Sequence, residues 1–286
     1  MISDITLGQF FPGSSPLHRL DPRSKILLTT LYIVALFLAN TPVSFLVMTV
    51  ITAVLIYVSG ISFSVILRGL KPVAFILLFT SILNLFLTTG SGDPLISFYF
   101  VNIYEEGIVR AIFMSLRVIV LIVGTSMLLT YTTSPISLTD GIEGLLSPLK
   151  KIGVPVHAFA MMMSIALRFI PTLVEETEKI MNAQKSRGAD FTSGGLVKRA
   201  RALVPLLVPL FMSSFKRADE LATAMECRCY RGDKNRTKLV KLEYKLIDIL
   251  WLISFSLLLV MIALSRGLPE IMAGRGALLE LLFYKI

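Results

Sequence analysis

Residues 26–58 read ILLTTLYIVALFLANTPVSFLVMTVITAVLIYV, two apolar runs that are separated only by Asn40, Thr41 and Pro42. An α-helix needs ~20 apolar residues, at 1.5 Å each, to cross a ~30 Å hydrocarbon core. Apolar blocks near this length recur along the chain. The stretch therefore predicts a helical hairpin that crosses a membrane twice.

The composition of the 286-residue chain agrees with this prediction. Hydrophobic residues make up 55% and charged residues 16%, and the mean hydropathy is +0.77. A soluble domain carries more charge than this, so lipid is the expected solvent. Residues 1–25 are polar and contain Pro and Gly, unlike a cleaved signal, so we expect the first span to be retained.

Three further apolar runs complete a bundle of about five spans. They are 72–87, 107–131 and 246–264. A sixth segment, 154–170, is also apolar enough to enter the bilayer, which leaves the number of spans open. Arg117 lies deep in the run 107–131, where we expect an intra-bundle or snorkelling contact more than a contact to a partner or substrate path.

The distribution of basic residues sets the orientation. His18, Arg19, Arg23 and Lys25 flank the first span, whereas the loop 88–106 carries acidic residues and no Lys or Arg. Basic residues favour the cytoplasmic side. We therefore expect a multi-pass protein of the cell membrane (the inner or plasma membrane) with a cytoplasmic N-terminus.

The middle of the chain differs from both ends. Residues 132–245 hold 18 Lys and Arg against 11 Asp and Glu, a net charge of +7 (18 − 11). Apolar residues at helical spacing predict amphipathic helices at about 135–152, 155–185 and 196–227. Pro171, Pro205 and Pro209 are expected breaks or kinks. We predict three regions: an N-terminal membrane region (1–131), a cytoplasmic helical region (132–245), and a last transmembrane helix with its tail (246–286).

Two of the amphipathic helices end alike. Each carries an Arg between two small residues, in the triplets Ser186-Arg187-Gly188 and Cys227-Arg228-Cys229. Ala183 and Ala224 each precede the Arg by four positions, which is one helical turn on the same face. Gln184 and Glu226 belong to the same last turns.

An Arg at a helix C-terminus is favoured by the exposed carbonyl groups, and small neighbours leave its guanidinium unobstructed. It can enter a narrow pocket and pair with a carboxylate in a forked, charge-assisted contact. Basic residues are also simply common near helix C-termini. Two matched tips, 41 positions apart (228 − 187), favour a two-site docking surface.

Three stretches carry a resemblance to a known family. They are GSSPLHRLDPR (13–23), NAQKSRGA (182–189) and AMECRCYRG (224–232). Together they make the chain resemble, along nearly its whole length, the transmembrane T component of energy-coupling factor (ECF) transporters (the EcfT/CbiQ-like family), which import vitamins and metal ions.

The resemblance implies a function and partners. The family's two small-Arg-small motifs end crossed coupling helices that dock into two ABC-type ATPase subunits, either alike or different. Arg187 and Arg228 correspond to the docking arginines, and Cys227 and Cys229 stand where the family usually has alanine or another small residue. Arg231-Gly232 offers a second register, but Ala224 and Glu226 favour Arg228. A separate membrane subunit binds the substrate.

Other functions are less well supported. No P-loop, H-E-x-x-H or G-x-S-x-G motif occurs, so we expect no enzyme, no cofactor and no metal site. The pairs His18/His157 and Cys227/Cys229 are poor ligand sets. The positive charge fits a membrane's cytoplasmic side better than nucleic acid. A self-contained secondary transporter, with polar residues in its spans and an inverted repeat, or a membrane scaffold remains the alternative.

Overall fold

The structure is a computed structural model that describes residues 10–88, 96–98, 101–189, 191, 195–232 and 242–265. These residues form two compact units. The first, which we call the bundle unit, comprises residues 10–134 together with residues from 242 onward. The second, the tip unit, lies within residues 135–241. The assignment of these segments to membrane or cytoplasm stays a prediction, and the tail after Ser265 lies outside the described residues.

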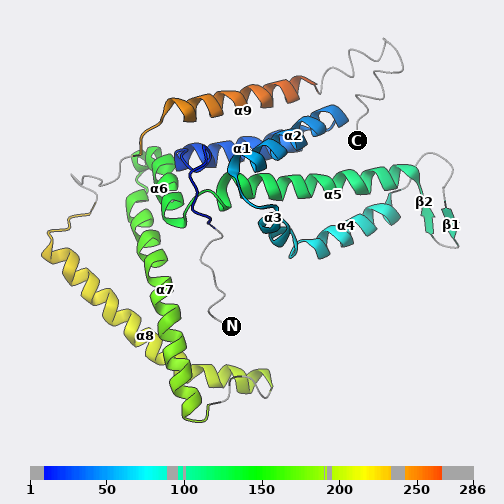
Figure 1. Cartoon of the computed structure of the whole chain (residues 1–286). Coiled ribbons are helices and arrows are strands. Elements are labelled where there is room, and N and C mark those ends of the chain that lie inside the picture. Colours follow the sequence, from blue (N-terminus) through cyan, green and yellow to red (C-terminus); the bar gives the residue numbers. More distant parts are fainter. Residues whose placement is uncertain are drawn as a thin grey trace. The chain divides into compact units, whose positions relative to one another are not determined.

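The bundle unit is helical apart from one small hairpin (Figure 1). Strands β1 (Ile96–Phe98) and β2 (Val101–Ile103) pair antiparallel, which the sequence did not predict. The helices are α1 (Pro22–Leu38), α2 (Pro42–Ser59), α3 (Phe63–Leu70), α4 (Ala74–Leu87), α5 (Glu105–Thr125) with the π-helical turn η1 (Ser126–Thr130), and α9 (Leu246–Ser265).

The prediction of an all-α polytopic membrane protein is confirmed. Among the described residues, four helices are long and apolar enough to cross a membrane, namely α2, α5 with η1, α7 (Val156–Ser186) and α9. Helices α3 and α4, bent by 62° around the turn 71–73, would make a fifth if they form one span. Pro72 lies in that turn, and it cannot donate a backbone hydrogen bond.

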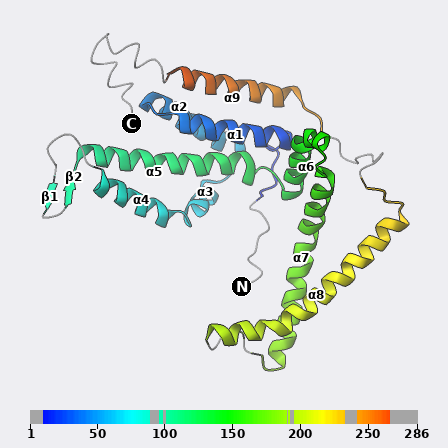
Figure 2. The same cartoon turned by 180° about the vertical axis from the view of Figure 1, so that it is seen from behind.

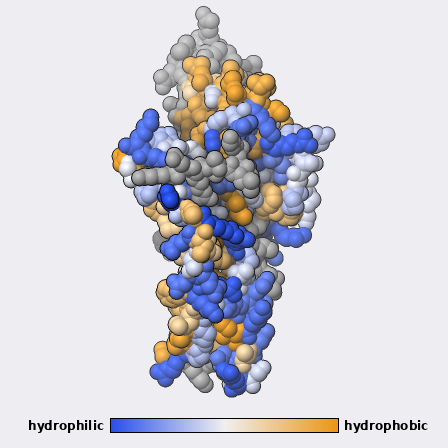
Figure 3. Space-filling view, turned by 90° about the vertical axis from the view of Figure 1, so that its left-hand side faces the viewer, coloured by the Kyte–Doolittle hydropathy of each residue, from blue (hydrophilic) through white to orange (hydrophobic). Residues whose placement is uncertain are grey.

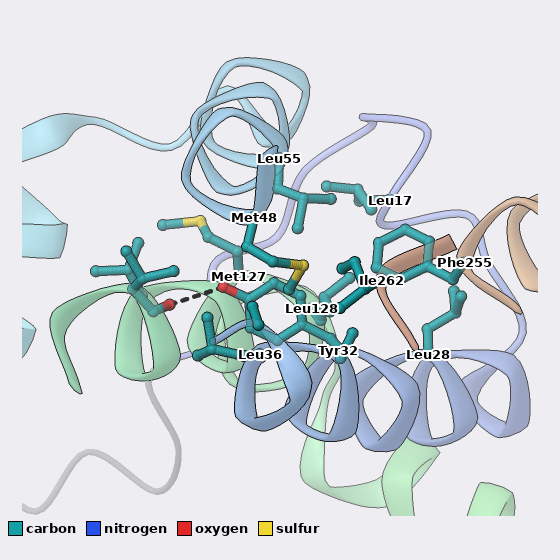
Figure 4. Close-up of a cluster of buried hydrophobic side chains, with 14 of the residues drawn as sticks. Leu17, Leu28, Tyr32, Leu36, Met48, Leu55, Met127, Leu128, Phe255 and Ile262 are labelled. Carbon is teal, nitrogen blue, oxygen red and sulfur yellow. Dashed lines mark hydrogen bonds between the residues drawn. The ribbon is translucent and has the colours of Figure 1, made fainter. Parts of the chain in front are cut away.

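Helix α1 has 17 residues and lies at the centre of the bundle unit. Its side chains Leu28, Tyr32 and Leu36 are buried among residues of α2, α5, η1 and α9 (Figure 4). The Tyr32 hydroxyl donates to the Val120 carbonyl at 2.9 Å and lies 2.7 Å from the Thr52 hydroxyl oxygen. A Cβ at Gly124 would clash with the Tyr32 ring, so α1 and α5 approach closely because this residue is glycine.

Arg117 makes an intra-bundle contact. Its guanidinium donates to the carbonyl of Ala39, the C-cap residue of α1, at 2.8 Å. A helix C-terminus carries partial negative charge and carbonyls without intrahelical partners. This contact favours the intra-bundle interpretation of the intramembrane Arg.

The N-terminal motif ties α1 to α9. Asp21 caps α1 by accepting from the Arg23 N–H at 2.8 Å, with Pro22 at the first helical position. The backbone N–H of Asp21 donates in turn to Asp248 Oδ1 at 2.8 Å, and Asp248 Oδ2 accepts from the Lys245 N–H at 2.8 Å. The buried Lys25 ammonium donates to the carbonyl of Thr132 at 2.7 Å. Three distant segments therefore meet at the start of α1.

The tip unit contains α6 (Pro135–Leu146), the 3₁₀ turn η2 (Ser147–Ile152), α7 and α8 (Leu196–Cys227). The single predicted helix 135–152 is thus an α-helix continued by a 3₁₀ turn. Pro171, Pro205 and Pro209 lie inside continuous helices, and α8 is visibly bent in its first half (Figures 1 and 2). Glu143 of α6 contacts His157 of α7 at 3.1 Å, and both side chains are buried.

We predict that Asp248→Ala lowers the free energy of unfolding by ~3 kcal/mol, because it leaves a buried N–H without its acceptor and removes a charge near Lys25. Thermal melting of the detergent-solubilised protein measures the effect. Asp248→Asn keeps one carbonyl acceptor, and its melting temperature should lie between those of the wild type and Asp248→Ala. An Ala variant that melts with the wild type would contradict the role of this contact.

Candidate functional site

The first tip is the C-terminal end of α7. Ser186 is the last helical residue, Arg187 is the C-cap, and Gly188 follows with φ +87°. The Gly188 N–H donates to the Lys185 carbonyl at 2.9 Å, and the Ala189 N–H donates to the Gln184 carbonyl at 3.0 Å. This pair of hydrogen bonds is the Schellman motif, in which a left-handed residue ends the helix.

The second tip, at the end of α8, repeats this geometry. Cys227 is the last helical residue and Arg228 is the C-cap. The Cys229 N–H donates to the Glu226 carbonyl at 2.8 Å, and the Tyr230 N–H donates to the Met225 carbonyl at 3.0 Å. Cys229 takes the place of Gly188, with φ +59°. Two triplets with different small residues therefore fold into the same cap.

The two arginines occupy equivalent backbone positions. Arg187 has φ −89° and ψ 8°, and Arg228 has φ −91° and ψ 15°. Both side chains are exposed, as are Ala183 and Ala224 one turn earlier. Arg231 lies three residues beyond the second cap, so Arg228 rather than Arg231 corresponds to Arg187. The geometry supports the register that the sequence favoured.

Cysteine at the second tip has a conformational cost. Cys229 is the only non-glycine residue with positive φ among the residues that the structure describes. For a residue with a Cβ the left-handed region costs roughly 1–2 kcal/mol. Cys227 and Cys229 are both exposed, free thiols.

The two helices cross at a contact well before their tips (Figures 1 and 2). The Arg217 guanidinium of α8 donates to Glu176 Oε2 of α7 at 2.9 Å. Beyond the crossing the tips lie at separate ends, so the six tip residues form two sites.

A groove of about 540 Å³ adjoins the second tip. One wall comes from the first half of α7, and the other comes from the end of α8 and the residues after it. Its lining residues are Met161, Ser164, Ile165, Leu221, Met225, Arg228, Cys229, Tyr230, Arg231 and Gly232. The sequence did not predict this groove, because its walls come from segments far apart in the chain.

The surface of α7 and α8 also carries large exposed apolar side chains. Figure 3 shows hydrophobic and hydrophilic side chains interspersed over the lower part of the view, where these helices lie. The most exposed of them are Phe159, Met162, Met163, Val197, Val208, Phe211, Met212 and Phe215. Leu206, by contrast, is only 5% exposed and lies beneath this surface.

The fold and the two tips define a polytopic α-helical membrane protein with a pair of arginine-capped helices. The sequence profile of the cobalt transport protein family (CbiQ) matches residues 13–239. Several proteins called energy-coupling factor transporter transmembrane protein EcfT are close relatives. The one from Clostridium kluyveri is 56% identical over 85% of this chain and 90% of its own length.

The relative from Acidaminococcus fermentans is 50% identical over 94% of this chain and all of its own length. The one from Bacillus subtilis is 50% identical over 85% of this chain and 91% of its own. The chain belongs to the CbiQ family and, within it, to the transmembrane proteins of energy-coupling factor transporters.

We predict that Cys229→Gly stabilises the second tip by ~1 kcal/mol and that Gly188→Ala destabilises the first by a similar amount, because both tips require a left-handed residue. Hydrogen exchange at the Tyr230 amide should be about fivefold slower in Cys229→Gly. Exchange at the Ala189 amide should be about fivefold faster in Gly188→Ala. Cys227→Ala removes a thiol at a helical position and serves as the control. Faster exchange in Cys229→Gly would contradict the cap geometry.

Proposed function

We propose that the chain is the non-catalytic energy-coupling subunit of an ABC-type ECF importer, in which ATP-driven motion of two ATPase subunits reaches a substrate-binding membrane subunit through α7 and α8. The observation that carries the proposal is the pair of identical Schellman caps, each of which presents one exposed Arg. One such cap is ordinary, whereas two on consecutive crossed helices suit two docking sites.

The chemistry of docking follows from the caps. Backbone N–H groups close the last carbonyls of each helix, so the Arg guanidinium is not needed for capping and remains exposed to a partner. Small side chains at Ser186, Gly188, Cys227 and Cys229 let a groove close around it. A carboxylate in that groove would form a forked pair with Arg, a geometry that Lys reproduces poorly.

The membrane partner would contact the apolar surface of α7 and α8. On this surface Met162, Met163, Leu203, Leu207 and Phe211 are exposed. Met161 is partly exposed, whereas the buried Leu206 does not belong to this surface. Methionine-rich surfaces repack against different partners, which suits exchange of substrate-binding subunits.

The proposed setting is the cell membrane, with the N-terminus and both tips cytoplasmic, where ATP is available. The basic flank of the first span supports this orientation. Vitamins or metal ions are the proposed cargo class, since energy-coupling factor transporters import such nutrients. The choice of molecule would belong to the substrate-binding subunit. The ATPases are either two copies of one subunit or two different ones.

We predict that Arg187→Glu and Arg228→Glu each weaken binding of co-expressed ABC ATPases from the same source by ~100-fold, because each places like charges in a closed groove. The double variant should retain no ATPase. Co-purification in detergent, followed by titration of purified ATPases, measures the loss.

Arg231→Glu is the matched control, because it makes the same charge change three residues past the second cap. It should bind ATPases nearly as the wild type does. ATPases that bind the double variant as well as the wild type would sink the two-tip proposal. In that case a self-contained secondary transporter or a scaffold becomes the better explanation.

A further inference from the structure

The contact at the helix crossing joins equivalent positions of the two arginine-capped helices. Glu176 and Arg217 are 41 residues apart in sequence, and the two cap arginines are separated by the same number (228 − 187). Arg187 therefore follows Glu176 by 11 residues (187 − 176), and Arg228 follows Arg217 by 11 (228 − 217). Each tip lies at the same distance along its helix from the crossing.

Helix geometry gives this spacing a meaning. Eleven residues correspond to about three turns, or ~16 Å along an α-helix, and bring the chain back to nearly the same face. Each cap position therefore lies close to the face on which its helix contacts the other. From the Glu176–Arg217 contact, each helix therefore continues for the same length and with like orientation to its cap arginine.

The charges at equivalent positions favour one pairing of the helices. The pair 176/217 is acidic in α7 and basic in α8, and the pair Lys179/Glu220 has opposite signs as well. Glu178 and Asp219, in contrast, are both acidic. The Glu176 and Arg217 side chains are 23% and 41% exposed, so water screens their contact only partly.

We propose that Glu176 and Arg217 are a positioning pair that holds the two arginine caps at one separation, to match a partner with two like grooves related by an approximate two-fold axis. This inference rests on the proposed docking function of the caps. Two-site binding gains affinity only when both sites can be engaged together, so a fixed separation strengthens binding without any further contact to the partner.

Pulsed electron resonance between spin labels tests the positioning directly in the purified full chain. Asn182→Cys and Thr223→Cys are exposed, equivalent positions near the tips, in a background in which Cys227 is Ala and Cys229 is Gly. The distance distribution should be narrow with the native pair. Glu176→Arg or Arg217→Glu should widen it about twofold, and the double charge exchange should restore it.

Glu178→Arg is the matched control, because it makes the same charge change at a position whose equivalent in α8 is also acidic. The distribution should stay narrow in this variant. The melting temperature of every variant separates a local effect from unfolding. Single variants that melt normally and keep the native distribution would overturn the proposal, as would a double exchange that fails to restore it.

Titration of the same variants with candidate ABC ATPases separates the positioning role of Glu176 and Arg217 from the proposed docking function of the caps. The single charge reversals should lower the affinity for the ATPase pair by about tenfold while both arginines remain intact, and the double exchange should recover it. If the wild type binds no ATPase although the distances respond as expected, the proposed function fails and the positioning role stands. If ATPases bind every variant equally, the match to a two-fold partner is wrong.

Discussion

A helix C-terminus leaves backbone carbonyls without intrahelical partners, and in a protein solvated largely by lipid those groups must find donors within the chain. In the bundle unit, cationic side chains donate hydrogen bonds to backbone carbonyls at helix ends. Arg117 donates to the C-cap carbonyl of α1, and Lys25 donates to the carbonyl of Thr132 just after η1. Arg117, which looks out of place in its apolar run, and Lys25 thereby hold α1 among its neighbours.

The same constraint is met differently at the two tips. There the backbone closes on itself, since N–H groups of the residues after each helix bond the carbonyls of its last turn. The Arg side chain at each cap is therefore not needed for capping its own helix, and it remains exposed. A single rule, that helix ends must be satisfied, thus separates structural cations within the bundle from the two arginines that are available to a partner.

Prediction from sequence succeeded where a feature is local. Apolar runs indicated a polytopic helical membrane protein. The ends of α7 and α8 were placed to within one residue. It missed features that depend on competition between segments: the bent pair α3–α4, the hairpin β1–β2 and the groove beside Arg228. A helical period identifies an apolar face, but it does not say what covers that face.

The sequence by itself determined the membrane class, the family and the two arginine tips, because apolar runs, family motifs and helix caps are each made of consecutive residues. A Schellman cap needs only six consecutive residues, so the cap positions of Arg187 and Arg228 can be recognised in the sequence. Only the tertiary structure decided which residues that are distant in the sequence contact one another. Asp21 and Asp248 are 227 residues apart, and Glu176 and Arg217 are 41 apart. Their contacts arise because helices pack at particular crossings, which no local period encodes.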